Sequence, residues 1–390
     1  MKAAVLYGKE ELNIVPDFED PIIKDSDVLV RSKHTGLCST DRTLYRGFVP
    51  FKPPLIIGHE IAGVVEEVGK STENLETGDH VIIPPVFPGC ENESCPACKE
   101  GLTNRCKNSI FIGHGVHGGD AEFISVPSRY TFKIKESVPL DEACIIPDAV
   151  STPFHGLKSR SVPPHIIQNS SNPNKLFEKS THWLKGKNVV VFGVGGVGGP
   201  TVNLAARYFQ AKNVLALDIF DNKLEFAKKL GATHVVNLKT YFEDNKILLN
   251  ELSGRDRAKA ISGLARHISS NFSEDKFQVD CVLDCSGVAD TFPVAIETAS
   301  KNRTIIQVGW PPKPVSEFLN QKIMDKYLTI NGTWACPMNE MEEIVKAVEE
   351  GKVDLDFLVT NKDYSLDTLE NAIHDLEKGK ILGRATIKIE

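Results

Sequence analysis

The chain has 390 residues, of which 41% are hydrophobic and 25% are charged, and its formal net charge is -7 at pH 7. This length predicts two domains, each large enough to bury its own core. The acidic balance excludes a broad basic surface for nucleic acid, and no apolar run approaches the length needed to span a membrane. Because the N-terminus lacks the apolar core and cleavage site of a secretory signal, we expect a cytoplasmic protein.

The first 130 residues contain short alternating strands broken by Gly, Pro and Asp, such as DVLVRS and IAGVVEEVG. This pattern predicts a mainly β region of antiparallel type. Cys38 and His59 fall on separate predicted loops within it. Taken alone, a cysteine or a histidine on a loop is more often an ordinary residue than a metal ligand. These two residues can therefore be interpreted as ligands only together with the other motifs of the chain.

Four cysteines follow within seventeen residues, in a C-x4-C-x2-C-x7-C pattern at Cys90, Cys95, Cys98 and Cys106. Four thiolates on one short lobe suit a closed tetrahedral zinc site, which is structural because no position is left for a substrate. Two disulfides or four unrelated thiols are the competing interpretations. A reducing compartment and a lobe with few apolar residues disfavour both. The other cysteines, at 144, 281, 285 and 336, have no ligand spacing and are expected to pack in the core or a pocket.

From about residue 150 strands alternate with helices, which predicts a parallel sheet with helices on both faces. A short β-branched strand at 188–192 runs directly into Gly193-x-Gly195-x-x-Gly198, with Gly196 and Val197 inside the turn. In this motif the first glycine permits the turn, the second lets a pyrophosphate approach, and the third lets the helix pack against the strand. The stretch therefore predicts a dinucleotide-binding turn rather than a purely structural one.

The next apolar run ends in Asp218, about twenty residues beyond the last glycine of the turn. A carboxylate at that point can hold a ribose 2'-hydroxyl and would repel a 2'-phosphate, so the sequence favours NAD over NADP. Lys223 could instead approach a phosphate or contact the ribose. Two later strands end at Gly287 and Gly309, on the side where such sheets bind ligands.

GHEIAG at 58–63, the four-cysteine lobe, the glycine turn and Gly383-Arg384 occur in an order that resembles the zinc-containing medium-chain dehydrogenases over nearly the whole chain. This superfamily includes alcohol, polyol and threonine dehydrogenases. The resemblance implies an α/β fold, with a Rossmann-type doubly wound parallel sheet and a mainly β, GroES-like catalytic domain. The implied domains are 1–150, which is catalytic and carries the zinc lobe at 90–106, then 151–334, which binds the dinucleotide, and 335–390, which returns to the catalytic domain.

The resemblance also implies a catalytic zinc ion. Cys38 and His59 would be two of its ligands. Asp148 would be the third, at a position where the family more often has Cys or Glu. Glu60 would be a second carboxylate near the metal, able to compete with Asp148 directly or through water. Thr40 would hydrogen-bond the substrate oxygen.

Other roles follow from the same resemblance. Asp41 would orient the histidine ligand, Thr152 would lie against the nicotinamide, and Arg384 would meet the pyrophosphate. One residue departs from the family pattern, because Thr43 stands where a histidine often ends the proton relay.

The implied activity is hydride transfer between NAD and the carbinol carbon of a small alcohol, with two zinc ions per chain, in a homodimer or homotetramer. The substrate could be a secondary alcohol, a polyol or an alicyclic hydroxy compound. A zinc-free enone or quinone reductase and a non-catalytic NAD-binding structural protein are the alternatives. Two segments are longer than is usual in the family. We interpret the one near 161–182 as a surface insertion and the charged one at 241–277 as a solvated excursion or an oligomer contact.

Overall fold

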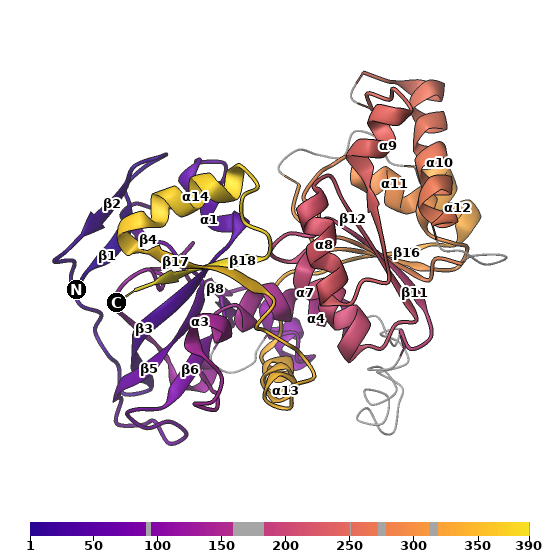
Figure 1. The fold of residues 1–390 in the computed structure, drawn as a ribbon. Helices are drawn as coiled ribbons and strands as arrows, with labels where there is room; N and C mark the ends of the chain where they lie inside the picture. The colour runs from indigo at the N-terminus through magenta and orange to yellow at the C-terminus, as the bar shows by residue number, and fades with distance from the viewer. Residues whose placement is uncertain (91–94, 159–182, 250, 272–277, 312–318, 390) are drawn as a thin grey trace, which may run out of the picture. The chain divides into compact units, whose positions relative to one another are not determined.

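The computed structural model describes the whole chain except residues 91–94, 159–182, 250, 272–277, 312–318 and 390. The chain divides into two compact units (Figure 1). One consists of Met1–His155 together with Ala335–Glu390, and the other is Gly156–Trp334. The first unit is therefore built from two separate stretches of sequence. The segment expected to be a surface insertion, at 161–182, lies outside the described residues.

The first unit is mainly β. Its largest sheet has seven strands in the order β10-β6-β5-β3-β18-β17, with β9 also paired to β3, and only the β17–β18 pairing is parallel. These strands are β3 (Asp27–Leu37), β5 (Glu60–Val68), β6 (His80–Ile83), β9 (Phe123–Pro127), β10 (Phe132–Lys133), β17 (Val359–Ser365) and β18 (Arg384–Lys388). The smaller sheets comprise β1 (Ala3–Leu6), β2 (Leu12–Val15) and β4 (Leu55–Ile56), and β7 (Val86–Phe87) with β8 (Ile110–Phe111). The predicted antiparallel β region is confirmed.

Short helices connect and cover these strands. They are α1 (Ser39–Tyr45), α2 (Pro96–Lys99), α3 (Leu140–Ala143), α4 (Ser151–Lys158), α13 (Met338–Glu349) and α14 (Leu369–Glu377). A wide π-type turn, Ile146–Val150, leads into α4. Helix α14 packs against the sheet because Leu369 and Ile373, four residues apart on one face, join Leu44 and Ile387 in a buried apolar cluster. The return segment thus shares its core with the N-terminal stretch.

The second unit contains six strands, all parallel, in the order β13-β12-β11-β14-β15-β16. This is the strand order of the doubly wound dinucleotide-binding sheet, so the predicted fold class is confirmed. The strands are β11 (Asn188–Phe192), β12 (Asn213–Asp218), β13 (His234–Asn237), β14 (Cys281–Asp284), β15 (Thr304–Gln307) and β16 (Thr329–Gly332). The helices are α7 (Gly198–Asn203), α8 (Asp221–Leu230), α9 (Leu238–Asp244), α10 (Gly254–Ser270), α11 (Thr291–Thr298) and α12 (Asn320–Lys326). A second π-type turn, Leu204–Tyr208, continues α7.

Helix α10 corrects one expectation. It lies in the charged segment that the sequence suggested was a solvated excursion or an oligomer contact, and for this helix the first of these interpretations is wrong. Ile261, Leu264 and Ile268 are at most 1% exposed and belong to the same apolar cluster as the sheet strands. Their spacing of three and four residues puts them on one face, while charged residues such as Arg255 and Lys259 are exposed.

Among the helices of the described residues, none has both the length and the apolar character that crossing a bilayer requires.

Candidate functional site

Three potential metal ligands meet in the first unit, each placed by the end of a secondary-structure element. Cys38 lies between β3 and α1, His59 directly precedes β5, and Asp148 lies in the π-type turn before α4. Asp148 Oδ2 is 3.6 Å from Cys38 Sγ and 3.6 Å from His59 Nε2. With Glu60, these residues offer ligand atoms that all lie within 4.8 Å of one another.

The distances fit a single zinc ion. Zinc bonds of about 2.3 Å to sulfur and about 2.0 to 2.1 Å to nitrogen and oxygen place tetrahedral donors about 3.3 to 3.6 Å apart. The measured separations of Asp148 Oδ2 from Cys38 and His59 match this spacing. A thiolate, an imidazole and a carboxylate are also a donor set that zinc prefers, and three donors leave one tetrahedral position for another ligand.

Asp41 holds both Cys38 and His59 in place. Its Oδ1 lies 3.1 Å from His59 Nδ1, and its Oδ2 accepts a 2.8 Å hydrogen bond from the backbone N–H of Cys38. The ring is thereby turned so that Nε2 faces Asp148. Burial by itself lowers the pKa of His59, but the charge of Asp41 and the hydrogen bonds to both carboxylates raise it well above its usual value. An environment that stabilises a proton so strongly also attracts a metal cation.

Glu60 is engaged by Arg384, a partner that the sequence reasoning missed. The guanidinium is 3% exposed; its Nε donates to Glu60 Oε2 at 3.0 Å, and its Nη2 donates to Oε1. The same Nη2 lies 3.5 Å from Asp148 Oδ2. Each Glu60 oxygen thus accepts from Arg384, whereas Asp148 Oδ2 lies 3.6 Å from both Cys38 Sγ and His59 Nε2. The expectation that Arg384 meets a pyrophosphate stays a prediction.

The charge state of Asp148 suits a ligand. Burial alone would raise the pKa of this carboxyl, but the hydrogen bond and charge of His59, together with the charge of Arg384, hold it well below its usual range. Thr152 Oγ1 donates to Asp148 Oδ1 at 2.8 Å, which leaves Oδ2 on the side of the other ligands. Asp148 is therefore an ionised and oriented carboxylate.

The remaining residues implied for this site have distinct positions. Thr40 Oγ1 lies 3.6 Å from Cys38 Sγ, so its hydroxyl borders the ligand cluster. Thr43 Oγ1 donates to the carbonyl of Ser39 at 2.7 Å, and its hydroxyl is thus used within α1. Phe111, to which the sequence gave no role, packs edge to face against His59 with ring centres 5.7 Å apart.

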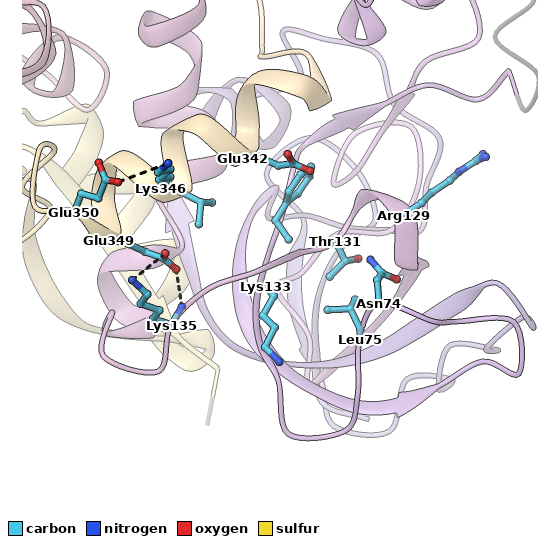
Figure 2. Close-up of a pocket in the computed structure, with 12 residues that line it drawn as sticks. Asn74, Leu75, Arg129, Thr131, Lys133, Lys135, Glu342, Lys346, Glu349 and Glu350 are labelled. Carbon is cyan, nitrogen blue, oxygen red and sulfur yellow. Dashed lines mark hydrogen bonds and ion pairs between the residues drawn. The ribbon is translucent and has the colours of Figure 1, made fainter.

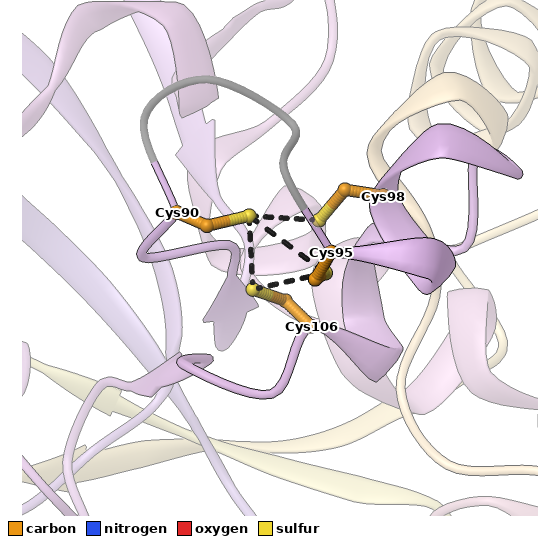
Figure 3. A group of neighbouring side chains, drawn as sticks. All are labelled: Cys90, Cys95, Cys98 and Cys106. Carbon is orange, nitrogen blue, oxygen red and sulfur yellow. Dashed lines mark hydrogen bonds between the residues drawn. The ribbon is translucent and has the colours of Figure 1, made fainter.

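The four cysteines of the lobe converge as predicted (Figure 3). The closest Sγ pairs are 3.3 to 3.9 Å apart, and every one of the four side chains is buried. A disulfide would need about 2.0 Å, whereas a ZnS₄ tetrahedron requires about 3.8 Å. The backbone N–H of Cys98 contributes most to lowering the pKa of Cys95, to about 6, which favours the thiolate form that zinc binds. The lobe fits a closed zinc site.

In the second unit, the backbone of the glycine turn has the conformation and the close contacts that the three glycines of the motif were predicted to allow. Gly193 has φ +82°, and a Cβ there would lie 2.7 Å from Cα of Ser286. A Cβ on Gly198 would lie 1.8 Å from the carbonyl oxygen of Gly193, so helix and strand pack too closely for any side chain. Gly195 faces open space, since a Cβ there would have no other atom of the described residues within 4 Å. An approaching phosphate would meet only backbone there.

Two neighbours of this turn complete its description. Gly196 and Val197 are partly exposed, and the Val197 carbonyl accepts a 3.0 Å hydrogen bond from Thr201 N as α7 begins. A Cβ on Gly309 would lie 2.6 Å from Gly287 N, so the loops after β14 and β15 touch.

Asp218 ends β12 and is 8% exposed. Its Oδ2 accepts from Val194 N at 2.8 Å, and its Oδ1 accepts from Ile219 N at 2.7 Å and from Phe220 N at 3.2 Å. A carboxylate has about four acceptor positions, so it can still accept from a ribose hydroxyl. The Lys223 ammonium lies 5.3 Å from the centre of the Phe220 ring.

A polar groove of about 520 Å³ lies elsewhere on the first unit, between the segment 129–135 and α13 (Figure 2). Lys135 pairs with Glu349 at 3.4 Å, and Lys346 pairs with Glu350 at 3.8 Å, so opposite charges along its wall neutralise one another. None of the clustered metal-ligand candidates lines it.

Both units match known protein families. Residues 24–136 match the model described as "Alcohol dehydrogenase GroES-like domain", and residues 196–350 match "Zinc-binding dehydrogenase". The chain is similar to sorbitol dehydrogenase 1 from Saccharomyces cerevisiae, with 30% identity over 349 residues, which cover 88% of this chain and 85% of the relative. It is also 29% identical over 394 residues to an alcohol dehydrogenase from Geobacillus stearothermophilus, with 100% of each chain covered. The solved alcohol dehydrogenase of Aeropyrum pernix superimposes with a TM-score of 0.78 at 27% identity, over 100% of both chains.

Proposed function

The chain belongs to the zinc-containing medium-chain dehydrogenases, and we propose that it oxidises a secondary alcohol or a polyol to the carbonyl compound with NAD as the hydride acceptor. The observation that carries this proposal is the convergence of Cys38, His59 and Asp148 at zinc-ligand spacing. Relatives named sorbitol dehydrogenase and D-xylulose reductase support a substrate with several hydroxyl groups. A zinc-free reductase would have no need of this ligand set.

Cys38, His59 and Asp148 would hold the catalytic zinc, and the four-cysteine lobe would hold the second zinc. The first ion would supply Lewis acidity, which lowers the pKa of a hydroxyl group and polarises a carbonyl group in the reverse direction. Cys38 and Asp148 contribute two negative charges, which balance a divalent cation. Arg384 offsets the third negative charge of the cluster, that of Glu60.

The other residues of the site bind and orient. Thr40 Oγ1 accepts a hydrogen bond from the substrate hydroxyl and so holds its proton at a defined atom. Asp41 keeps the His59 ring in one orientation through Nδ1. Thr152 fixes the second oxygen of Asp148, so that a single oxygen points at the cation. Phe111 excludes water from the ring edge of His59.

In the second unit, the turn from Gly193 to Gly198 would bind the cofactor pyrophosphate through backbone N–H groups, and Asp218 would accept hydrogen bonds from the adenosine ribose. Lys223 would contribute to the ribose side, and Gly309 would lie near the nicotinamide half, in the loop at the carboxyl end of β15.

The proposal is tested by measuring zinc per chain in freshly purified protein and alcohol-dependent NADH formation with and without a chelator. We expect about two zinc ions per chain and activity that the chelator abolishes. Full activity on an enone without zinc would identify a reductase instead. Cofactor binding without turnover of secondary alcohols or polyols would identify a non-catalytic protein.

Asp218 is predicted to set the choice of cofactor. A 2'-phosphate beside this carboxylate would place like charges close together and lose the ribose hydrogen bonds, at a cost of about 2 to 4 kcal/mol, or roughly thirtyfold to nearly a thousandfold. The wild type should therefore show a higher kcat/KM with NAD than with NADP by that factor, and Asp218→Ser should lose most of the preference. Both kcat/KM values of a variant are measured on the same protein sample, so their ratio does not depend on the fraction of that sample that is folded.

Asp221→Ser is the matched control, because Asp221 is an exposed acid three residues further along the chain. It should keep the preference of the wild type. Equal use of both cofactors by the wild type, or an unchanged ratio in Asp218→Ser, would show that another residue makes the choice.

A further inference from the structure

Two loops flank the crossing point of the parallel sheet. From β11 the chain adds β12 and β13 on one side of the sheet, and from β14 it adds β15 and β16 on the other side. Ligands of such sheets bind at the C-terminal ends of the two strands where the direction changes, here β11 and β14. One loop is the glycine turn after β11, and the other is the segment 285–290 after β14. They are in contact, since a Cβ on Gly193 would lie 2.7 Å from Ser286 Cα. The second loop therefore borders the edge of the sheet at which a ligand is expected to bind.

The inner end of segment 285–290 is fixed by Asp284, which is fully buried. Its Oδ1 accepts hydrogen bonds from Ser286 N at 3.1 Å and from Ser286 Oγ at 2.7 Å. Its Oδ2 accepts from Thr291 Oγ1 at 2.7 Å. Since Thr291 directly follows Asp290, these bonds tie both ends of the loop to the end of β14.

Arg257 of α10 gives the outer end a second tie, to a helix outside the loop. Nη2 of this arginine donates to Asp290 Oδ1 at 2.7 Å, and Nη1 donates to the backbone carbonyl of Leu249. The Arg257 side chain is 6% exposed, whereas that of Asp290 is 41% exposed. A planar guanidinium presents its donors in a rigid fork on separate nitrogens, whereas an ammonium group donates from a single nitrogen.

Leu249 connects Arg257 to a second feature of the same sheet edge. With Ile219, Phe242 and Leu248 it lines an apolar pocket of about 550 Å³. Ile219 directly follows Asp218, the acid at the end of β12. One buried arginine thus supports both the loop at the crossing point and the wall of a pocket beside the ribose-binding acid.

We propose that Arg257 is a positioning residue for the dinucleotide cofactor, which holds the loop at Asp290 and the pocket wall at Leu249 in their binding positions without touching the cofactor itself. The inference rests on the proposed function, because it assumes that this sheet edge binds NAD. Helix α10 has an independent tie to α11, in which Ser262 Oγ donates to Glu297 Oε1 at 2.8 Å. Loss of Arg257 therefore removes the ties to Asp290 and Leu249, while the bond between Ser262 and Glu297 still connects the two helices.

The test compares Arg257→Met, which keeps the apolar stem, with Arg257→Lys, which keeps the charge but replaces the two-nitrogen fork by a single nitrogen. The dissociation constant of NADH is measured by fluorescence titration at a temperature at which every variant is folded, along with Tm without cofactor and kcat at saturating NAD. We expect the NADH dissociation constant to rise about tenfold in Arg257→Met, which corresponds to about 1.4 kcal/mol, with kcat within about twofold of the wild type. Arg257→Lys should be intermediate.

Arg255→Met is the matched control, since Arg255 is exposed on the same helix. Its NADH affinity should equal that of the wild type. If Arg257→Met does not fold, Asp290→Ala tests the loop contact alone and should also weaken NADH binding. A lower Tm with unchanged NADH affinity in these variants would make Arg257 merely structural and overturn the inference. A wild type that binds no NADH would instead refute the proposed function.

Discussion

The Asp148→Asn variant is expected to lose about a thousandfold or more in kcat, equivalent to about 4 kcal/mol of transition-state stabilisation. Asparagine keeps the size of the side chain but removes one of the two anionic donors that face a cation between Cys38, His59 and residue 148. It also leaves the guanidinium of Arg384 with less negative charge nearby. The measurement is steady-state turnover of a polyol with NAD, combined with zinc analysis of the same sample.

The zinc analysis separates this effect from unfolding, because the four-cysteine lobe is chemically intact in the variant. Zinc content should fall from about two ions per chain to about one. Asp356→Asn, at an exposed aspartate of the same unit, should keep both zinc ions and full turnover.

The rival ligand is Glu60, and cobalt substitution distinguishes the two carboxylates. The visible spectrum of cobalt in the catalytic site should change in Asp148→Asn and persist in Glu60→Gln, since Asp148 is the carboxylate at ligand spacing from Cys38 and His59. The reverse pattern would assign the third ligand to Glu60. Glu60→Gln should nevertheless be less stable than the wild type, because it leaves a buried arginine without its partner.

Features encoded by short stretches of sequence could be predicted. The glycine turn and Asp218 lie within one strand-helix-strand unit, and each residue type has a steric or chemical reason at its position. The four cysteines lie within seventeen residues, so their spacing alone indicated a common site. The parallel sheet followed from the alternation of strands and helices.

Contacts between distant residues could not be predicted in the same way. Glu60 and Arg384 are 324 positions apart, and no local pattern signals that β5 and β18 bring them together. The sequence therefore assigned each residue to a different ligand. For α10, the many charged residues concealed a buried stripe, although the three-and-four spacing of Ile261, Leu264 and Ile268 was present in the sequence.

Replacing Cys95 with serine is expected to remove the second zinc ion and unfold the lobe while leaving the ligands of the other site in place. Apolar packing contributes little to the lobe, because among the described residues its buried cluster consists of the four cysteines with only Ala97 packed against them as a partly buried apolar residue. In small zinc-folded modules metal binding contributes about 10 to 16 kcal/mol, so even a fraction of that value would lower Tm markedly.

The measurements are zinc per chain, Tm and the rate of proteolysis within 90–106. Zinc should fall to about one ion per chain, Tm should drop, and cleavage in the lobe should accelerate. Cys144→Ser is the control, because the Cys144 sulfur contacts the carbonyl of Asp141 at 3.5 Å, a contact that a hydroxyl can keep, and it lies outside both ligand sets. If Cys95→Ser kept two zinc ions and the Tm of the wild type, the four sulfurs would not form a metal site, and their convergence would have to be explained by packing alone.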